Sequence, residues 1–396
     1  MPLDFVATLD QYRSELLDRT VPFWLKYGLD WKHGGICTCI SDEGKVLRGD
    51  KYVWSQLRAI WTFSALYNKI ERKPEYLDVA THIFDFIKRF GRNEKGEWYF
   101  CLDQDGKPLF DGATSIYCDG FAIYGFAEFA RATNNQDAID LAREAFANVQ
   151  PRIARPGSYQ THPLPIPAGA KAHGISMIFS LAFHELGRYL NDPAMIKAGL
   201  EHANQVMTVF LRPEHKRLYE FVALDDSLMD TPPGQAVNPG HAIESMWFMI
   251  HIFQYHKDQE RVRQAIDAIK WHLELGWDEP YGGILLARDP EGSFWADKWD
   301  TKLWWPHTEA LYALLLAYSI THEDWCLEWF ERVHNYAFSH FPVPKYGEWI
   351  QNLDRQGNKM SATVALPVKD PFHLSRALIH SIGILGSLAE DATTLN

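Results

Sequence analysis

The stretch GEWYFCLDQDG, residues 96–106, decides the fold because a close copy, GEWIQNLDRQG, stands at residues 347–357. Each copy opens with glycine, continues through apolar and aromatic residues, and ends in an aspartate-containing turn that closes on glycine. This order is typical of a strand, a turn and a second strand. GGICTCISDEG (34–44) and GGILLARDPEG (282–292) share the pattern. The sequence therefore predicts a structure built from repeats.

The spacing of these hairpins gives the length of the repeat. Gly35 and Gly96, in the first two copies along the chain, are 61 residues apart, and Gly283 and Gly347, in the last two, are 64 residues apart. Steps of 61 residues from Gly96 reach Gly157 and then Leu218, where the sequence reads as loop or strand with a weak hairpin pattern. Six units of this length fill the 396 residues.

Between the hairpins, apolar residues recur at helical spacing. The stripes are Tyr76, Ala80, Ile83, Phe84 and Ile87; Val262, Ile266, Ile269 and Leu273; and Trp325, Trp329, Val333 and Tyr336. Six helix pairs with short β-hairpin-like connections predict an all-α (α/α)6 toroid, because closure buries both terminal repeats. No linker rich in proline, glycine or serine divides the chain, so we expect a single catalytic domain over residues 1–396.

Composition excludes several classes of partner. The formal net charge of -12 argues against nucleic acid and anionic membranes. The longest apolar run, residues 310–320, is too short to span a bilayer. The five cysteines form no CxxC pair, and the N-terminus has no apolar signal segment. We therefore expect a reduced protein of the cytoplasm.

One polar residue follows each hairpin at a nearly constant distance. These residues are Arg58, Asp119 and His241, each 23 residues after its anchor glycine or leucine, His307 at 24, His373 at 26 and His173 at 16. Each lies near the start of an apolar helix, and equivalent positions of a closed toroid converge at one mouth. The sequence therefore predicts a shared polar cavity there.

The stretch NPGHAIESMWF, residues 238–248, adds residues to this cavity. His241, Glu244 and Trp247 are spaced by three residues and so share one helix face. The other candidates are Glu309 and, for substrate binding, Asn238, Lys302, Trp54, Trp304 and Trp305. Aromatic faces beside charged and amide groups suit a sugar. No tight spacing of metal ligands occurs, so we expect no essential metal.

Histidine is the natural general acid and base near neutral pH. Two histidines on opposite sides of one carbon could remove a proton from one face and return it to the other, while Arg58 stabilises the enolate oxygen. Other interpretations stay open. Each histidine or tryptophan could belong to the core, Glu244 and Glu309 could be structural partners of arginine or lysine, and Asp119 could cap a helix or orient Arg58.

NPGHAIESMWF, KLWWPHTEAL, WSQLRAIWTF and FHLSRA resemble segments of the N-acylglucosamine 2-epimerase family, and the resemblance runs from about residue 10 to 388. It implies an (α/α)6 barrel and a C2 epimerisation without a cofactor, through ring opening and an enediolate. By this resemblance His241 and His373 are the catalytic pair, Arg58 holds O1 or the enolate oxygen, and Glu244 and Glu309 orient the histidines. It also implies a homodimer and stimulation by ATP, for which the sequence has no nucleotide motif.

Two segments depart from the acyl-sugar members. AKAHGISM around His173 looks more like mannose isomerases and epimerases of unacylated sugars, and ALPVKDPFH replaces a Gly-Lys-Trp-Lys-Gly-Cys stretch. We expect an N-acylglucosamine 2-epimerase, with a mannose-type aldose–ketose isomerase or an epimerase of unacylated sugars as the alternative. A glycoside hydrolase and a non-catalytic carbohydrate- or protein-binding module rank below these.

Overall fold

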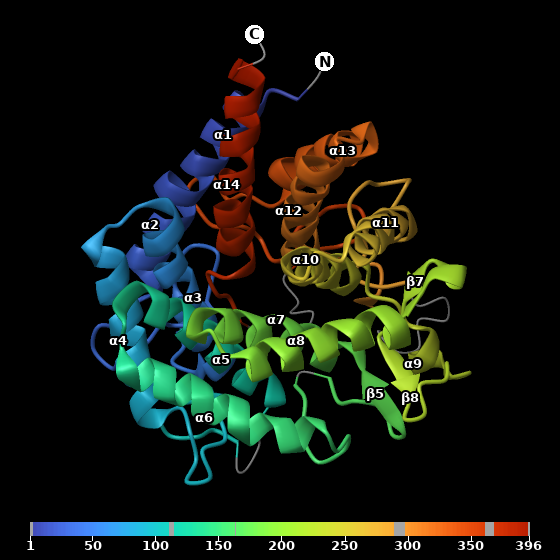
Figure 1. Ribbon diagram of the computed structural model, residues 1–396. Coiled ribbons are helices and arrows are strands. Elements are labelled where there is room, and N and C mark those ends of the chain that lie inside the picture. The colour runs from blue at the N-terminus through green and yellow to red at the C-terminus, as the bar shows by residue number, and fades with distance from the viewer. Residues whose placement is uncertain (1–2, 111–114, 163, 289–297, 361–367, 395–396) are drawn as a thin grey trace.

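The computed structural model describes residues 3–110, 115–162, 164–288, 298–360 and 368–394. Within these ranges, inner and outer helices alternate along the chain and form a double-layered ring (Figure 1). The inner helices are α3 (Val53–Ala65), α5 (Ile116–Thr133), α7 (His173–Leu190), α10 (Pro239–Tyr255), α12 (Trp304–Thr321) and α14 (His373–Thr394). The outer helices are α1 (Phe5–Ser14), α4 (Pro74–Phe90), α6 (Gln136–Ile153), α8 (Pro193–Gln205), α11 (Gln259–Gly276) and α13 (Asp324–His340).

Short elements connect these helices. The helical ones are α2 (Val21–Phe23), α9 (Pro232–Gln235), a 3-10 turn (Pro213–His215) and π-helical turns at Glu15–Thr20, Trp24–Gly28, Leu66–Ile70 and Val206–Phe210. The strands are β1 (Cys39–Ile40), β2 (Val46–Arg48), β3 (Lys51–Tyr52), β4 (Cys101–Leu102), β5 (Ala170–Ala172), β6 (Leu211–Arg212), β7 (Arg217–Leu218), β8 (Phe221–Ala223), β9 (Lys302–Leu303) and β10 (Asn352–Leu353).

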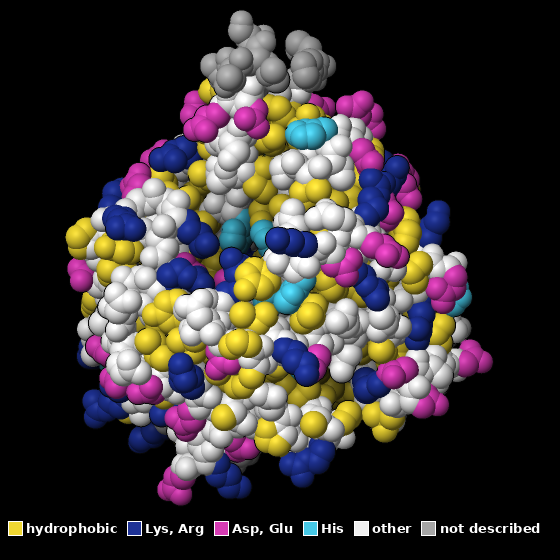
Figure 2. Space-filling view, viewed as in Figure 1, with side chains coloured by type: hydrophobic (Ala, Val, Ile, Leu, Met, Phe, Trp, Pro, Cys, Tyr) yellow, Lys and Arg dark blue, Asp and Glu magenta, His cyan; other side chains and the backbone are white. Residues whose placement is uncertain are grey.

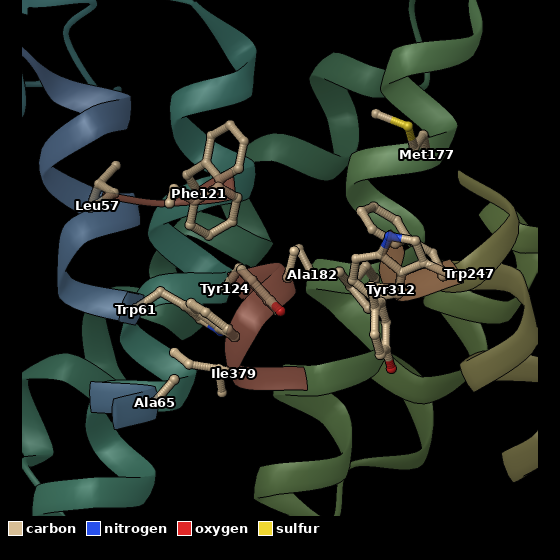
Figure 3. Close-up of a cluster of buried hydrophobic side chains, with 14 of the residues drawn as sticks. Leu57, Trp61, Ala65, Phe121, Tyr124, Met177, Ala182, Trp247, Tyr312 and Ile379 are labelled. Carbon is tan, nitrogen blue, oxygen red and sulfur yellow. The ribbon is translucent and has the colours of Figure 1, made fainter. Parts of the chain in front are cut away.

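The two layers follow from the apolar patterns of their helices. All residues of α12 from 305 to 317 are buried, as expected of a helix packed on every side. The outer helix α4 buries one stripe, the one that its helical spacing predicts. At the centre of the ring, Trp61 of α3 stacks on Tyr124 of α5 with ring centroids 5.4 Å apart, and Ile379 of α14 lies beside them (Figure 3).

The ring closes where the first repeat meets the last. Helix α1 packs against α14, and both chain ends emerge side by side (Figure 1). The indole N–H of Trp349 donates to Oε1 of Glu15 at 2.7 Å, and the rings of Phe5 and Tyr318 lie 5.9 Å apart. Closure therefore buries the terminal repeats against each other, as predicted.

The predicted hairpins lie where the chain passes from an outer to an inner helix. In four repeats an antiparallel bridge joins the end of the outer helix to the hairpin; the bridges are Leu29↔Ile36, Arg92↔Trp98, Trp277↔Ile284 and Pro342↔Trp349. In the fourth repeat along the chain, strands β6 and β7 pair Leu211 with Leu218. Gly347, with φ 95°, needs glycine also for space, since a Cβ there would lie 2.6 Å from the carbonyl oxygen of Arg19. The end of the third hairpin, 289–292, falls outside the described residues.

Strands of neighbouring repeats pair at this end of the ring: β3 with β4, β5 with β8 and β9 with β10. Since β3, β5 and β9 lead directly into α3, α7 and α12, the inner helices begin at one mouth. The (α/α)6 fold is confirmed. All five cysteines are free and buried. Among the described residues, none of the helices combines the length and apolar character that crossing a membrane requires.

Candidate active site

Polar residues near the starts of the inner helices gather at the hairpin mouth. Arg58, Glu244 and Glu309 are the sixth residues of α3, α10 and α12. His241 is the third residue of α10, and His373 is the first of α14. Because these helices begin at the same mouth, residues at matching depths approach one another.

His373 is held by Glu309, a carboxylate whose negative charge is balanced by a buried arginine. Its Nδ1 lies 2.8 Å from Oε1 of Glu309. The same oxygen accepts from Nη2 of Arg376 at 2.7 Å, and Oε2 of Glu309 accepts from the indole N–H of Trp247 at 2.8 Å. Arg376 also binds Glu244, so one buried guanidinium serves two buried carboxylates.

The surroundings of His373 favour its neutral form. Burial lowers the pKa of this histidine, and the charges of Arg58 and Arg376 also lower it, against the opposing charge of Glu244. A neutral ring that donates Nδ1–H to Glu309 carries its lone pair on Nε2. The structure therefore presents His373 as a proton acceptor.

His241 has a different carboxylate behind it. Its Nδ1 lies 3.0 Å from Oε2 of Glu220, a buried residue between β7 and β8. Burial lowers the pKa of His241, but Glu220 and, less strongly, Glu244 outweigh this effect, so that the pKa is raised. His241 is therefore the better proton donor of the two histidines.

One indole lies next to both imidazole rings. The ring of Trp305 is 5.1 Å from that of His241 and 5.5 Å from that of His373, centroid to centroid. The side chains of His241 and His373 are 31% and 10% exposed, so both keep some contact with solvent. Two histidines in complementary protonation states thus flank one aromatic surface.

Arg58 supplies a cation beside this pair. Its Nη1 donates to Oδ2 of Asp370 at 3.3 Å, and its guanidinium lies 4.1 Å from the ring centroid of Phe121 and 5.3 Å from that of Trp54. Its guanidinium also lies 5.1 Å from the ring centroid of Phe372, the residue before His373, and its positive charge disfavours the protonated form of both catalytic histidine candidates. In Figure 2, histidine side chains lie among lysine and arginine side chains near the centre of the face shown.

The prediction that His307 lines the cavity is wrong. Its side chain is fully buried, its Nε2 accepts from the backbone N–H of Ile284 at 2.8 Å, and its Nδ1 bonds to the carbonyl of Leu303 at 2.6 Å. Burial lowers the pKa of His307 to about 3. This histidine fastens the hairpin to α12, which is the core role left open above.

Asp119 neither caps a helix nor orients Arg58. Both of its carboxylate oxygens lie 3.0 Å from Nη1 of Arg152, and the residue is fully buried. Burial raises the pKa of Asp119 to about 7 against the opposing charge of Arg152. It links α5 to α6 within one repeat.

Other predicted substrate-binding residues have structural partners. Lys302 is buried against Asp278, with Nζ 3.1 Å from Oδ2. Asn238 caps α10, accepting from the N–H of His241 at 3.0 Å, and Trp247 is buried on Glu309. Trp54 and Trp304 are half-buried; Trp304 lies 6.2 Å from His373 between ring centroids. Trp54, Trp304 and Trp305 thus stay substrate-binding predictions.

His173 lies behind His241 and not on the cavity wall. It is fully buried, with Nε2 3.0 Å from Oγ of Ser245 and Nδ1 3.7 Å from Oε1 of Glu220. Burial lowers the pKa of His173, against the opposing effect of Glu220. Its influence on a substrate must therefore pass through Glu220 or Ser245.

One group of side chains has the spacing of metal ligands. The ligand atoms of Glu244, Glu309 and His373 lie within 4.8 Å of one another. Arg376 already places its positive charge on both carboxylates, so the cluster has a built-in cation. The three side chains are therefore better suited to binding Arg376 than to binding a metal ion.

Comparison with known proteins agrees with the fold and with the family resemblance of the sequence motifs. The model of the N-acylglucosamine 2-epimerase family matches residues 34–377. An N-acylglucosamine 2-epimerase of Bos taurus is 30% identical over 380 residues, which cover 94% of this chain and 90% of that protein. Fold and relatives together support an isomerase of the carbohydrate epimerase class.

The chain belongs to the N-acylglucosamine 2-epimerase family, as its motifs predict. Among solved structures, a cellobiose 2-epimerase from Bacillus thermoamylovorans superimposes with a TM-score of 0.83 at 21% identity, over 95% of this chain and 99% of that one. A D-mannose isomerase superimposes with a TM-score of 0.78 at 16% identity, over 99% and 100%. These two likenesses concern the fold.

Sequence reasoning missed three members of the site: Glu220, Asp370 and Arg376. Glu220 interrupts an apolar strand-like stretch, LYEFVA, and an acid in such a place is a signal that could have been used. Arg376 follows His373 by three residues and so shares its helix face. Asp370 gives no comparable signal.

Proposed function

We propose that the protein interconverts the C2 epimers of a reducing sugar, with N-acylglucosamine and N-acylmannosamine as its first substrate pair. One observation supports this best. His241 and His373 are each bound at Nδ1 by a carboxylate, and both lie against Trp305. Two bases held in this way suit a reaction that removes a proton from one face of a carbon and adds one to the other.

The reaction needs the open-chain sugar, whose C1 carbonyl makes the C2 proton acidic. Neutral His373 takes this proton on Nε2, and the C–H electron pair moves into a C1–C2 double bond while the carbonyl electrons move to O1. Arg58 stabilises the negative charge on O1. His241 then donates its proton to C2 from the other face, and the C1 carbonyl re-forms. After exchange of the two ring protons with solvent, the pair is ready again.

Carboxylates alone do not explain the site. Hydrolysis of a glycoside with inversion needs two carboxyl groups about 6.5–9.5 Å apart with space for water between them. Glu244 and Glu309 are both bound by Nη2 of one buried arginine, Arg376. Neither is free to protonate a leaving group, which disfavours the hydrolase.

A second candidate substrate class is an unacylated sugar. Its support is His173, which packs behind the His241–Glu220 pair where the acyl-sugar members of the family differ in sequence. An isomerase of mannose would use the same enediolate but return the proton to C1. The two candidates therefore share the first step and differ in where the proton returns.

We further propose that the whole chain acts as one domain in the cytoplasm, as a homodimer, and that the chemistry needs no cofactor, with ATP as a possible activator only. The acidic net charge of -12 and the free cysteines support a reduced compartment without a nucleic-acid partner. The dimer and the effect of ATP rest on family resemblance alone.

Proton NMR in D2O tests the function and the substrate together. The protein is incubated in turn with N-acetylglucosamine, N-acetylmannosamine, glucose and mannose, with and without ATP. Deuterium at C2 together with signals of the epimer supports the epimerase and identifies its sugar. Ketose signals support the isomerase. Absence of exchange with all four sugars contradicts the proposal for these substrates.

A further inference from the structure

The two histidine–carboxylate pairs of the site are chemically unequal. Glu309 shares its charge among three donors, of which the guanidinium of Arg376 carries a full positive charge. Glu220 binds His241 through Oε2, and its Oε1 has no hydrogen-bond partner. The imidazole Nδ1 of His173 lies 3.7 Å from this Oε1.

We propose that Glu220 is a positioning residue that keeps His241 protonated, and that this uncompensated carboxylate makes His241 the proton donor and His373 the acceptor of the resting enzyme. The inference rests on the proposed epimerase function and deepens it. None of the motifs that carry the family resemblance contains Glu220, because it lies between β7 and β8 and not on an inner helix.

The backbone holds Glu220 in place on both sides. Its carbonyl accepts from the N–H of His173 at 2.9 Å, and its N–H donates to the carbonyl of Ala236 at 3.3 Å. The adjoining strand β8 pairs with β5, the strand that leads into α7. The carboxylate therefore has a fixed position under His241 before any substrate binds.

The other charged groups around His241 act in opposite directions, each less strongly than Glu220. Glu244 on α10, which is paired with Arg376 of α14, favours the imidazolium, and Arg58 of α3 disfavours it. His173 of α7 is buried, and burial keeps its pKa low, so it adds no opposing charge near neutral pH. Glu220 is thus the charge that decides the protonation of His241. Burial raises the pKa of the Glu220 carboxyl, but His241, with a smaller effect of His173, outweighs burial and brings this pKa to about 2.

The difference between the two histidine–carboxylate pairs predicts which face of C2 receives a proton from the enediolate intermediate. In the wild-type protein, His241 carries the proton that completes inversion. With Glu220→Gln the hydrogen bond to the ring can persist, but the charge that favours imidazolium is gone. His373 still removes the C2 proton and returns one to the same face. Exchange at C2 without inversion therefore rises relative to inversion.

The test measures this partition in D2O for the wild-type protein, Glu220→Gln and Glu220→Asp, starting from each epimer. Glu15→Gln is the matched control, because Glu15 is a buried carboxylate whose partner is the indole N–H of Trp349 and not a histidine of the site. For Glu220→Gln we expect the ratio of exchange to inversion to rise about 10-fold or more, which corresponds to about 1.4 kcal/mol between the two outcomes. Glu220→Asp should restore part of the inversion, and Glu15→Gln should keep the wild-type ratio.

The pH profile gives a second readout that a structural role would not change. The basic limb of kcat/KM follows the loss of the His241 proton, so Glu220→Gln should move it to lower pH by roughly one to three units. A variant with the wild-type ratio and the wild-type basic limb overturns the inference while the epimerase function stands. A wild-type protein that exchanges no C2 proton overturns both.

If Glu220→Gln does not fold, NMR of the imidazole Cε1–H groups in the wild-type protein decides the matter. We expect His241 to be charged and His373 to be neutral at pH 7. A neutral His241 at that pH overturns the inference.

Discussion

Replacement of Arg376 by methionine probes the electrostatic centre of the site. The guanidinium is buried, binds Glu244 and Glu309, and lies 4.4 Å from the ring centroid of Phe372. Methionine keeps most of the apolar packing and leaves two carboxylates buried without a cation. Removal of one partner from a buried ion pair costs about 3–5 kcal/mol of the free energy of unfolding. An unfolding entropy of about 2.1 cal/mol/K per residue, over 396 residues, converts this to a fall in Tm of about 4–6 °C.

Arg332→Met is the matched control for this substitution. Arg332 also stacks on aromatic rings, 4.6 Å from Trp277 and 4.8 Å from Trp329, and binds one carboxylate, that of Glu279, at 2.6 Å. Both partners are exposed, so its loss should cost less than about 1 kcal/mol. Calorimetry measures both variants. Equal Tm values for the two would refute the assignment of a buried cation that holds two carboxylates.

Three further predictions concern single features of the site. Arg58→Met should lower kcat by roughly 10²–10³, with partial recovery in Arg58→Lys, because the enediolate loses its oxyanion partner; unchanged steady-state rates would contradict this. His307→Leu should lower the free energy of unfolding by about 1–3 kcal/mol, because the buried N–H of Ile284 loses its hydrogen-bond acceptor, and should leave kcat/KM near wild type. Loss of activity in a protein of normal stability would contradict this prediction. The kcat/KM profile should be bell-shaped. Its acid limb should lie near the pKa of His373, about 3, where that base becomes charged, and its basic limb should lie above pH 6.5, at the raised pKa of His241, where that acid loses its proton; a profile with no basic limb up to about pH 9 would contradict this.

The fold was predictable because each repeat can be recognised from a short stretch of sequence. Glycine turns and helical apolar stripes recur about every 61 residues, and each recurrence needs no long-range information. The third repeat lacks the clear hairpin of the others, and Gly157 there lies in a turn. Pairing of β5 with β8, across repeats, could not be read from the hairpin pattern.

The cavity residues were predicted only in part, because a helix turns by about 100° per residue. His307 and Asp119 are the fourth residues of α12 and α5, and both face partners in their own repeat. Arg58 and Glu309 are sixth residues and bind residues of the site, Asp370 and His373. Two positions rotate a side chain by about 200°, to the opposite side of the helix. A count from the hairpin that is uncertain by one or two residues cannot make this distinction.

Glu220 and Arg376 illustrate what the sequence leaves out. The effect of a carboxylate on the pKa of its histidine depends on whether a cation already binds that carboxylate. Glu309 meets Arg376 only after α12 and α14 pack together, 67 residues apart in the chain. The same packing leaves Glu220 without such a partner. The difference between the two histidines is therefore a property of the assembled ring.

The central claim is that two histidines act on opposite faces of one carbon, and single-histidine variants test it most directly. Each of His241→Asn and His373→Asn is incubated in D2O with each pure epimer, and deuterium at C2 is followed by NMR together with inversion. The account predicts that neither variant interconverts the epimers at an appreciable rate. His241→Asn should exchange the C2 proton of one epimer without inversion, and His373→Asn should do so for the other epimer only. Inversion at a near wild-type rate in either variant, or exchange of the same epimer by both, would contradict the two-histidine account.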